Sequence, residues 1–220
     1  MITLALEAAT YAGSVAVIDG SAVRAERTVA MRGREHEALM PAVAAVLGDA
    51  GIGMGDVVRV ACGAGPGAFT SLRIAGGIAK GLALAGGIPL VAVSSLALIV
   101  AAAPLAAGRY LAVLDAMRGQ SYAATFVVDD EMAIAGDGPV RIIESRELAA
   151  EAGRLDARLV GPAIGESGGI GPHARGFARL ANMTDAARPA DLAGWEPAYG
   201  RLAEAQVQWE AQHGRPLLPT

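Results

Sequence analysis

The sequence predicts an α/β protein in which an antiparallel meander leads into parallel strands. The first residues alternate apolar runs with turn signals, and the stretch that follows alternates helix-like and strand-like segments. The expected order is strand, strand, strand, helix, strand, helix, strand. A weaker repeat of strand, strand, strand, helix, strand follows, which suggests a duplicated unit whose second copy is shortened.

The elements of the first half are read from apolar runs and their boundaries. Three strands are expected in ITLALEAA, SVAVID and AVRAERTVA, and Gly20 closes the second of them. A helix is expected in REHEALMPAVAAVLGDAG, where apolar residues recur at helical spacing and Gly51 stands at the C-terminal cap. DVVRVACG and IPLVAVSS are interpreted as strands, and SLALIVAAA as a helix.

The second half repeats this order in weaker form. RYLAVLDA, QSYAATFVVDD and PVRIIE are interpreted as strands, SRELAAEAG as a helix and ARLVGPA as a strand. GESGGIGPHARG is expected to be a loop, and the end of the chain to form a helix after an extended entry. We therefore expect a first subdomain over residues 1–105, a degenerate second subdomain over 106–198, and a C-terminal helix and tail over 199–220.

Composition excludes several classes of function. The net charge is −4, and no basic tract marks a phosphate surface, so strong direct binding to nucleic acid is disfavoured. The single cysteine, Cys62, excludes an intramolecular disulfide and a cysteine-based zinc site. The N-terminus lacks the pattern of a signal peptide, and Pro104 interrupts the most apolar later run, so we expect a cytoplasmic protein without a membrane span.

The stretch GAGPGAFTSLRIAGGIAK follows a predicted strand and opens a helix. A Walker A loop would need Gly-Lys, and the chain has no such pair. A dinucleotide site is disfavoured because no acidic residue ends the next strand, and a nucleophile elbow would need serine between the glycines. Thr70 and Ser71 are interpreted as N-cap candidates for the helix.

The helix that follows this turn has two faces. The apolar stripe consists of Leu72, Ala75, Ile78, Ala79 and Leu82. The neighbouring face consists of Arg73, Gly76, Gly77 and Lys80, the only lysine in the chain. Interior glycines cost up to about 1 kcal/mol each relative to alanine, so they need a reason. They either pack closely on the protein's own sheet or form a flat surface for a partner's helix.

Four stretches resemble the TsaB (YeaZ) family. GAGPGAFTSLRIAGGIAKGLALAGGIPLVAVSSLALI is similar to the family's Gly-Pro-Gly turn and Ala-Lys-Gly-Leu helix. RGREHEALMPAVAAVL, LDAMRGQSYAATF and EPAYGR resemble its first helix, its Asp-Ala-Arg hairpin and its C-terminal Pro-x-Tyr-x-Arg. The sequence departs from the family pattern at Glu7, Glu37, Ser71 and Gln120, which stand where Asp, Ser, Gly and Glu are usual.

The resemblance implies an actin-like ATPase (ASKHA, RNase H-like) fold and a non-catalytic subunit of the complex that makes threonylcarbamoyladenosine in tRNA. The implied partners are a TsaD-type subunit, a TsaE-type ATPase and, when alone, a second copy of the chain. The chain is expected to hold no cofactor of its own; any ATP or ADP would bind at the interface with TsaD, and Glu7 and Thr10 are the nucleotide-proximal candidates. The partner-interface candidates, from the first two helices, are His36, Leu39, Met40, Val43, Leu72, Arg73, Gly76, Gly77 and Lys80.

The residues give no reason to assign catalysis. TsaD resembles this family but carries a metal-binding His-x-x-x-His, and the corresponding positions here are Ser95 and Ile99, which cannot replace those ligands. The three histidines are far apart, and the carboxylates each have an ordinary place at a strand end or turn, so no catalytic residue, metal or cofactor is assigned. Two alternatives stay open. One is an enzyme, either a glycopeptidase-like hydrolase or a kinase or ATPase of the actin-like superfamily, and the other is a free-standing nucleotide-binding protein.

Overall fold

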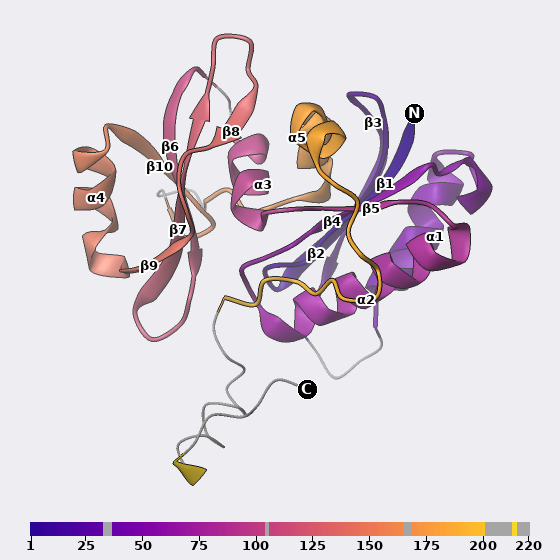
Figure 1. Cartoon of the computed structure of the whole chain (residues 1–220), viewed down its shortest axis with the longest axis horizontal. Coiled ribbons are helices and arrows are strands. Elements are labelled where there is room, and N and C mark those ends of the chain that lie inside the picture. The colour runs from indigo at the N-terminus through magenta and orange to yellow at the C-terminus, as the bar shows by residue number, and fades with distance from the viewer. Residues whose placement is uncertain (33–36, 104–105, 165–168, 201–212, 215–220) are drawn as a thin grey trace.

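The computed structural model describes residues 1–32, 37–103, 106–164, 169–200 and 213–214. These residues form two β-sheets that stand side by side with helices between and outside them (Figure 1). We call the first sheet with its helices the first lobe, and the second sheet with its helix the second lobe.

The first sheet has the strand order β3-β2-β1-β4-β5. Strands β1, β2 and β3 form the antiparallel meander, and β4 and β5 run parallel to β1. The bounds are β1 Ile2–Glu7, β2 Ala12–Asp19, β3 Ala22–Ala30, β4 Arg59–Gly63 and β5 Leu90–Val93. Four of these strands lie within the stretches that the sequence predicts, and β2 begins two residues before its predicted stretch, SVAVID.

Three α-helices belong to this half of the chain. They are α1 Leu39–Asp49, α2 Phe69–Gly86 and α3 Ser95–Ala102, and a short 3-10 turn, η1 Met54–Asp56, follows α1. Gly51 has φ +68°, as the expected C-terminal cap requires. The expected N-cap of α2 is wrong. Ala68 precedes the helix with an extended backbone and no side-chain cap, and Ser71 is buried inside the first turn.

The second sheet has the order β10-β6-β7-β8, and β9 also pairs with β7. Its bounds are β6 Gly108–Asp115, β7 Gln120–Val128, β8 Ile134–Gly136, β9 Arg141–Glu144 and β10 Ala157–Val160, with η2 Ser145–Glu147 and α4 Leu148–Arg154 before β10. Strand β6 lies antiparallel to β7 and parallel to β10, as β1 lies to β2 and β4. The three-residue strand β8 was not expected.

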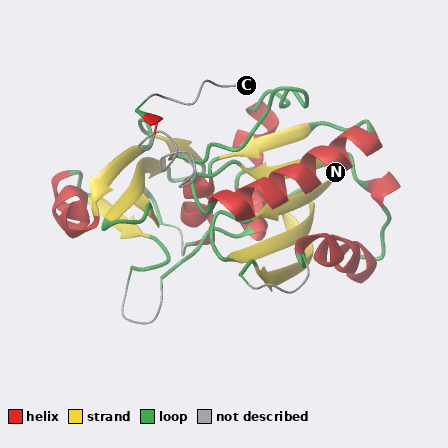
Figure 2. Cartoon of the chain, turned by 90° about the horizontal axis from the view of Figure 1, so that it is seen from below, coloured by secondary structure: helices red, strands yellow, loops and turns green. Residues whose placement is uncertain are grey.

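The elements form five layers. Leu4 and Leu6 of β1 face the core under α1 and α2, whereas Ala5 faces α3, as the two-residue period of a strand requires. Tyr110 and Ala112 of β6 also face α3, and the opposite face of that sheet packs on α4. Helix α3 thus lies between the sheets, while α2 crosses the outer face of the first sheet (Figure 2).

After β10 the chain returns to the first lobe. A 3-10 helix, η3 Ala174–Arg179, packs on β2 and α3, and α5 Ala181–Ala186 contacts β5. The sequence groups residues up to 198 with the second half, whereas residues 174–198 lie against the first. Most of the expected C-terminal helix over 199–220 falls outside the described residues. Within the part of the chain that is described, no helix has the length and apolarity to cross a membrane.

Candidate functional site

The carboxyl ends of three parallel strands meet at one edge of the first sheet. Glu7 ends β1, Gly63 ends β4, and Ser94 and Ser95 follow β5. In open α/β sheets ligands bind outside this edge, where the chain leaves the strands in opposite directions. We call this place the crevice.

Glu7 forms the floor of the crevice and is completely buried. Its Oε1 accepts a hydrogen bond from the backbone N–H of Ala9, and its Oε2 accepts one from Ser95 Oγ at 2.8 Å. Ser95 Oγ in turn accepts the backbone N–H of Gly65 at 3.1 Å. Ser95 Oγ therefore accepts one hydrogen bond from Gly65 and donates one to Glu7. One carboxyl group therefore joins β1 to the start of α3 and to the turn before α2.

Burial raises the pKa of Glu7 from its ordinary value of 4.5 to about 7. The hydrogen bonds from Ala9, Ser95 and Ala8 lower it, but they do not offset the loss of water around the carboxyl group. Glu7 also contributes to raising the pKa of the buried Cys62 thiol, after the main effect of burial. Cys62 therefore has no reactive thiolate near neutral pH.

The turn before α2 is packed too closely to admit a ligand between it and the β1–β2 turn. A Cβ atom on Gly63 would collide with the Glu7 carboxyl, and one on Gly67 would collide with the carbonyl oxygen of Ala9. The N–H of Ala68 donates to that same carbonyl at 2.7 Å. Thr10, the second nucleotide-proximal candidate, bonds to the backbone of Ala12 within its own turn. The described contacts do not bring it to Glu7.

The outer side of the crevice is covered by residues Trp195–Gly200, which we call the strap. The N–H of Ala198 donates to the carbonyl of Ala64 at 2.7 Å, and the ring of Tyr199 lies 4.6 Å from the ring of Phe69. Phe69 is only half-buried and packs on the strap. Gly76 lies beneath the strap, since a Cβ there would be 3.0 Å from Pro197 Cγ.

The partner-interface candidates fall into three groups. Leu39, Val43 and Leu72 are core residues of this chain, with 0%, 1% and 0% of their surface exposed, so they cannot be presented to a partner. The strap covers Gly76, and Lys80 Nζ donates to the carbonyl of Trp195 at 2.9 Å. The exposed candidates are Met40, Arg73 and Gly77, and His36 lies outside the described residues.

Two further residues extend this exposed face of α2. Gly81 has nothing within 4 Å of where a Cβ would lie, as is also true of Gly77. Leu84 is 73% exposed. Both stand at helical spacing from Gly77, so the three-and-four period of the sequence was the signal that could have identified them.

The positions that would correspond to the metal ligands of TsaD are buried in α3. Ser95 holds Glu7, and Ile99 lies in the apolar core. Across the described ranges, no three His, Cys, Asp or Glu side chains gather closely enough to hold a metal ion. His173 caps η3, where its Nδ1 accepts the N–H of Arg175 at 3.1 Å.

Comparison with known proteins gives matches over most of the chain. The family model "TsaD: tRNA N6-adenosine threonylcarbamoyltransferase" matches residues 30–156. A Bacillus subtilis protein named tRNA threonylcarbamoyladenosine biosynthesis protein TsaB is 29% identical over 95% of this chain and 98% of its own. The Escherichia coli protein of the same name is 38% identical over 59% of this chain and 57% of its own. The chain belongs to the TsaB (YeaZ) family.

Solved structures of YeaZ proteins share the fold. A Pseudomonas aeruginosa protein described as similar to peptidase YeaZ gives a TM-score of 0.75 at 26% identity, covering 91% of this chain and 99% of its own. YeaZ from the same organism gives a TM-score of 0.70 at 27% identity, covering 86% of this chain and 95% of its own. The predicted actin-like, RNase H-like α/β fold is confirmed, and so is the family that the sequence motifs indicate.

Proposed function

We propose that this TsaB-family chain is a non-catalytic dimerisation and scaffold subunit in the biosynthesis of threonylcarbamoyladenosine in tRNA. It would bind a TsaD-type threonylcarbamoyltransferase and hold it in its active arrangement. The observation that carries the proposal is membership of a family whose curated relatives are named as biosynthesis proteins of this modification.

The outer face of α1 and α2 supports a partner-binding role. Met40 on α1 is 41% exposed, and Arg73, Gly77, Gly81 and Leu84 line the exposed side of α2. A helix face that combines two bare glycines with an exposed leucine lets another helix approach its backbone closely. The same face would serve the homodimer of the isolated chain.

The crevice supports the non-catalytic part of the proposal. A catalytic acid or base has to reach a reacting group, but Glu7 is enclosed and both of its oxygens accept bonds from the protein itself. Ser95 and Ile99 offer no metal-binding pair in α3. We therefore infer that chemistry takes place on the TsaD-type partner.

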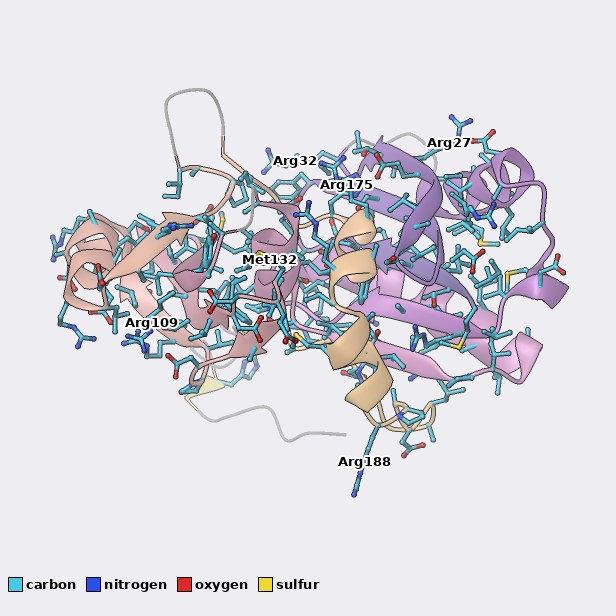
Figure 3. The ribbon with its side chains drawn as sticks, turned by 90° about the horizontal axis from the view of Figure 1, so that it is seen from above. Arg27, Arg32, Arg109, Met132, Arg175 and Arg188 are labelled. Atoms are coloured by element: carbon cyan, nitrogen blue, oxygen red, sulfur yellow. The ribbon has the colours of Figure 1, made fainter. Side chains whose placement is uncertain are left out.

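The remaining partners follow from the same proposal. A TsaE-type ATPase would join the assembly, and ATP or ADP would bind at the interface with the TsaD-type subunit, without any cofactor held by this chain alone. We expect the assembly in the cytoplasm. Contact with tRNA would come mainly from the partner, because the chain has a net charge of −4 and the arginines labelled in Figure 3 are spread over both lobes.

The test is reconstitution with the TsaD-type subunit of the same organism. Gly77→Leu adds a side chain where the isolated chain has open space, so the monomer should fold and the approach of a partner's helix should be blocked. We expect co-purification with the partner to be lost and tRNA modification to fall to the level seen without this chain.

Gly153→Leu is the matched control. Gly153 is also an exposed helical glycine with open space around it, but it lies on α4 in the second lobe. Co-purification of Gly77→Leu at the level of Gly153→Leu would refute the α1–α2 surface. Full tRNA modification without this chain would refute the subunit role itself.

A further inference from the structure

The crevice lies beside the second lobe, and the strap that covers it contacts that lobe at Tyr122. On the first-lobe side it is bordered by the ends of β1 and β4, and on the second-lobe side by Tyr122 near the start of β7. Ligand sites in α/β folds occur at the carboxyl ends of parallel strands and at the junctions of domains, and both descriptions apply here. In this chain the place is filled by the protein itself.

The strap spans the mouth of the crevice and contacts both lobes. On the first lobe, the N–H of Ala198 donates a hydrogen bond to the carbonyl of Ala64. The ring of Tyr199 packs against the ring of Phe69. On the second lobe, Tyr122 Oη donates to the carbonyl of Tyr199 at 3.4 Å, and a Cβ on Gly200 would be 2.5 Å from the Tyr122 ring. The strap therefore needs glycine at position 200 to pass the second lobe this closely.

Two further contacts fix the course of the strap. Lys80 Nζ donates a hydrogen bond to the carbonyl of Trp195, the first residue of the strap. The carbonyl oxygen of Ala198 would lie 2.4 Å from a Cβ on Gly65, which has φ +85°. The N–H of Gly65 also donates to Ser95 Oγ, which in turn donates to Glu7. The strap therefore packs on one side of this turn, and the Ser95–Glu7 pair lies on the other.

We propose that the strap takes the place of a bridging ligand and fixes the relative position of the two lobes. Helix α3 joins the lobes through the middle of the molecule, and the strap joins them at the carboxyl edge of the strands. A rotation of one lobe about α3 would separate Tyr122 from Phe69 and Ala64, and the strap opposes it. The relative position of the lobes is then the same with and without nucleotide.

The test uses the full chain carrying Lys80→Met and Tyr199→Ala, which remove the bond to Trp195 and the ring contact with Phe69. Spin labels are attached to Val23→Cys on the first lobe and Glu147→Cys on the second, both exposed, while the native Cys62 is completely buried and stays unlabelled. Labelled chain is diluted with unlabelled chain so that each distance is measured within one copy.

We expect the distance distribution to be narrow in the parent and to broaden in the strap variant. Hydrogen exchange of the Ala198 amide should become about tenfold faster, because two of the contacts that protect it are gone. ATP should leave the distribution of the parent unchanged. Val58→Ala is the control and should behave like the parent, because Val58 is exposed and precedes β4 at the end of that strand opposite the crevice.

Faster exchange at Ala198 with an unchanged narrow distribution would overturn the proposal, since the lobes would then be fixed without the strap. Unchanged exchange would also overturn it, because these contacts would not hold the strap. Narrowing or displacement of the parent's distribution by ATP would show that a ligand still sets the lobes. If the double variant fails to fold, the spin-label distances and the exchange of the Ala198 amide are measured in Lys80→Met alone. No measurement involves the TsaD-type partner, so the result is independent of the proposed function.

Discussion

At the scale of single residues, the enclosed carboxyl group of Glu7 links the end of β1 to the start of α3 and, through Ser95, to the turn before α2. The sequence identifies Glu7 as a departure from the family pattern and suggests that it lies near a nucleotide. It cannot reveal that Ser95, 88 positions later, donates a hydrogen bond to the carboxyl group. Nor can it reveal that the N–H of Gly65 donates to the oxygen of that serine. Hydrogen bonds between distant residues leave no periodic signal. The consequence, an enclosed carboxyl group without a route to a ligand, therefore required the fold.

The raised pKa of Glu7 predicts a pH dependence of stability. The folded chain binds the Glu7 proton more tightly than the unfolded chain, so stability should fall as pH rises from 4.5 to about 7 and should level off above that value. The difference of about 2.5 units corresponds to about 3 kcal/mol. Urea unfolding of the wild type and of Glu7→Gln, measured between pH 5 and pH 8, tests this.

The comparison with Glu7→Gln separates Glu7 from other titrating groups. Burial lowers the pKa of His173, so that residue makes stability rise with pH over part of the same range, in both proteins alike. Subtracting the pH profile of the unfolding free energy of Glu7→Gln from that of the wild type leaves the contribution of Glu7. A flat difference between pH 5 and pH 8 would show that the Glu7 pKa is not raised.

At the scale of elements, α2 was predicted well along one face and incompletely along the other. Leu72, Ala75 and Ala79 are buried as the apolar stripe predicts. Gly76 and Gly77 looked equivalent in sequence, yet the strap covers the first and the second faces open space. Adjacent helical residues point about 100° apart, and the cover comes from a segment more than a hundred positions away. The sequence pattern therefore could not distinguish them.

This difference between the two glycines can be measured in the isolated chain. Gly77→Ala should raise the free energy of unfolding by up to about 1 kcal/mol, because alanine is the better helix former and no neighbour is displaced. Gly76→Ala should gain less or lose stability, because its Cβ would press on Pro197 and Trp195. Equal stabilisation of both variants in urea unfolding would mean that the strap does not lie on α2.

At the scale of the whole molecule, the duplication was the most informative signal in the sequence. Its two runs of strand, strand, strand, helix, strand are present as β1–β4 with α1, and as β6, β7, β9 and β10 with α4. Strand β8 was missed because three residues are too short to show an alternating pattern. The return of residues 174–200 to the first lobe was missed because those residues form short, irregular elements whose place is set by long-range packing.

Helix α3 has a consequence for how the chain folds. Seven of its eight residues, Ser95 to Ala101, are buried, and its side chains face both sheets at once. Neither sheet can exclude water from its inner face until this helix and the other sheet are in place. We therefore expect urea unfolding followed by circular dichroism and by Trp fluorescence to give one coincident transition. A chain cut after residue 105 would expose an apolar helix and aggregate. Although the halves repeat one plan, we expect the molecule to unfold as a single cooperative unit.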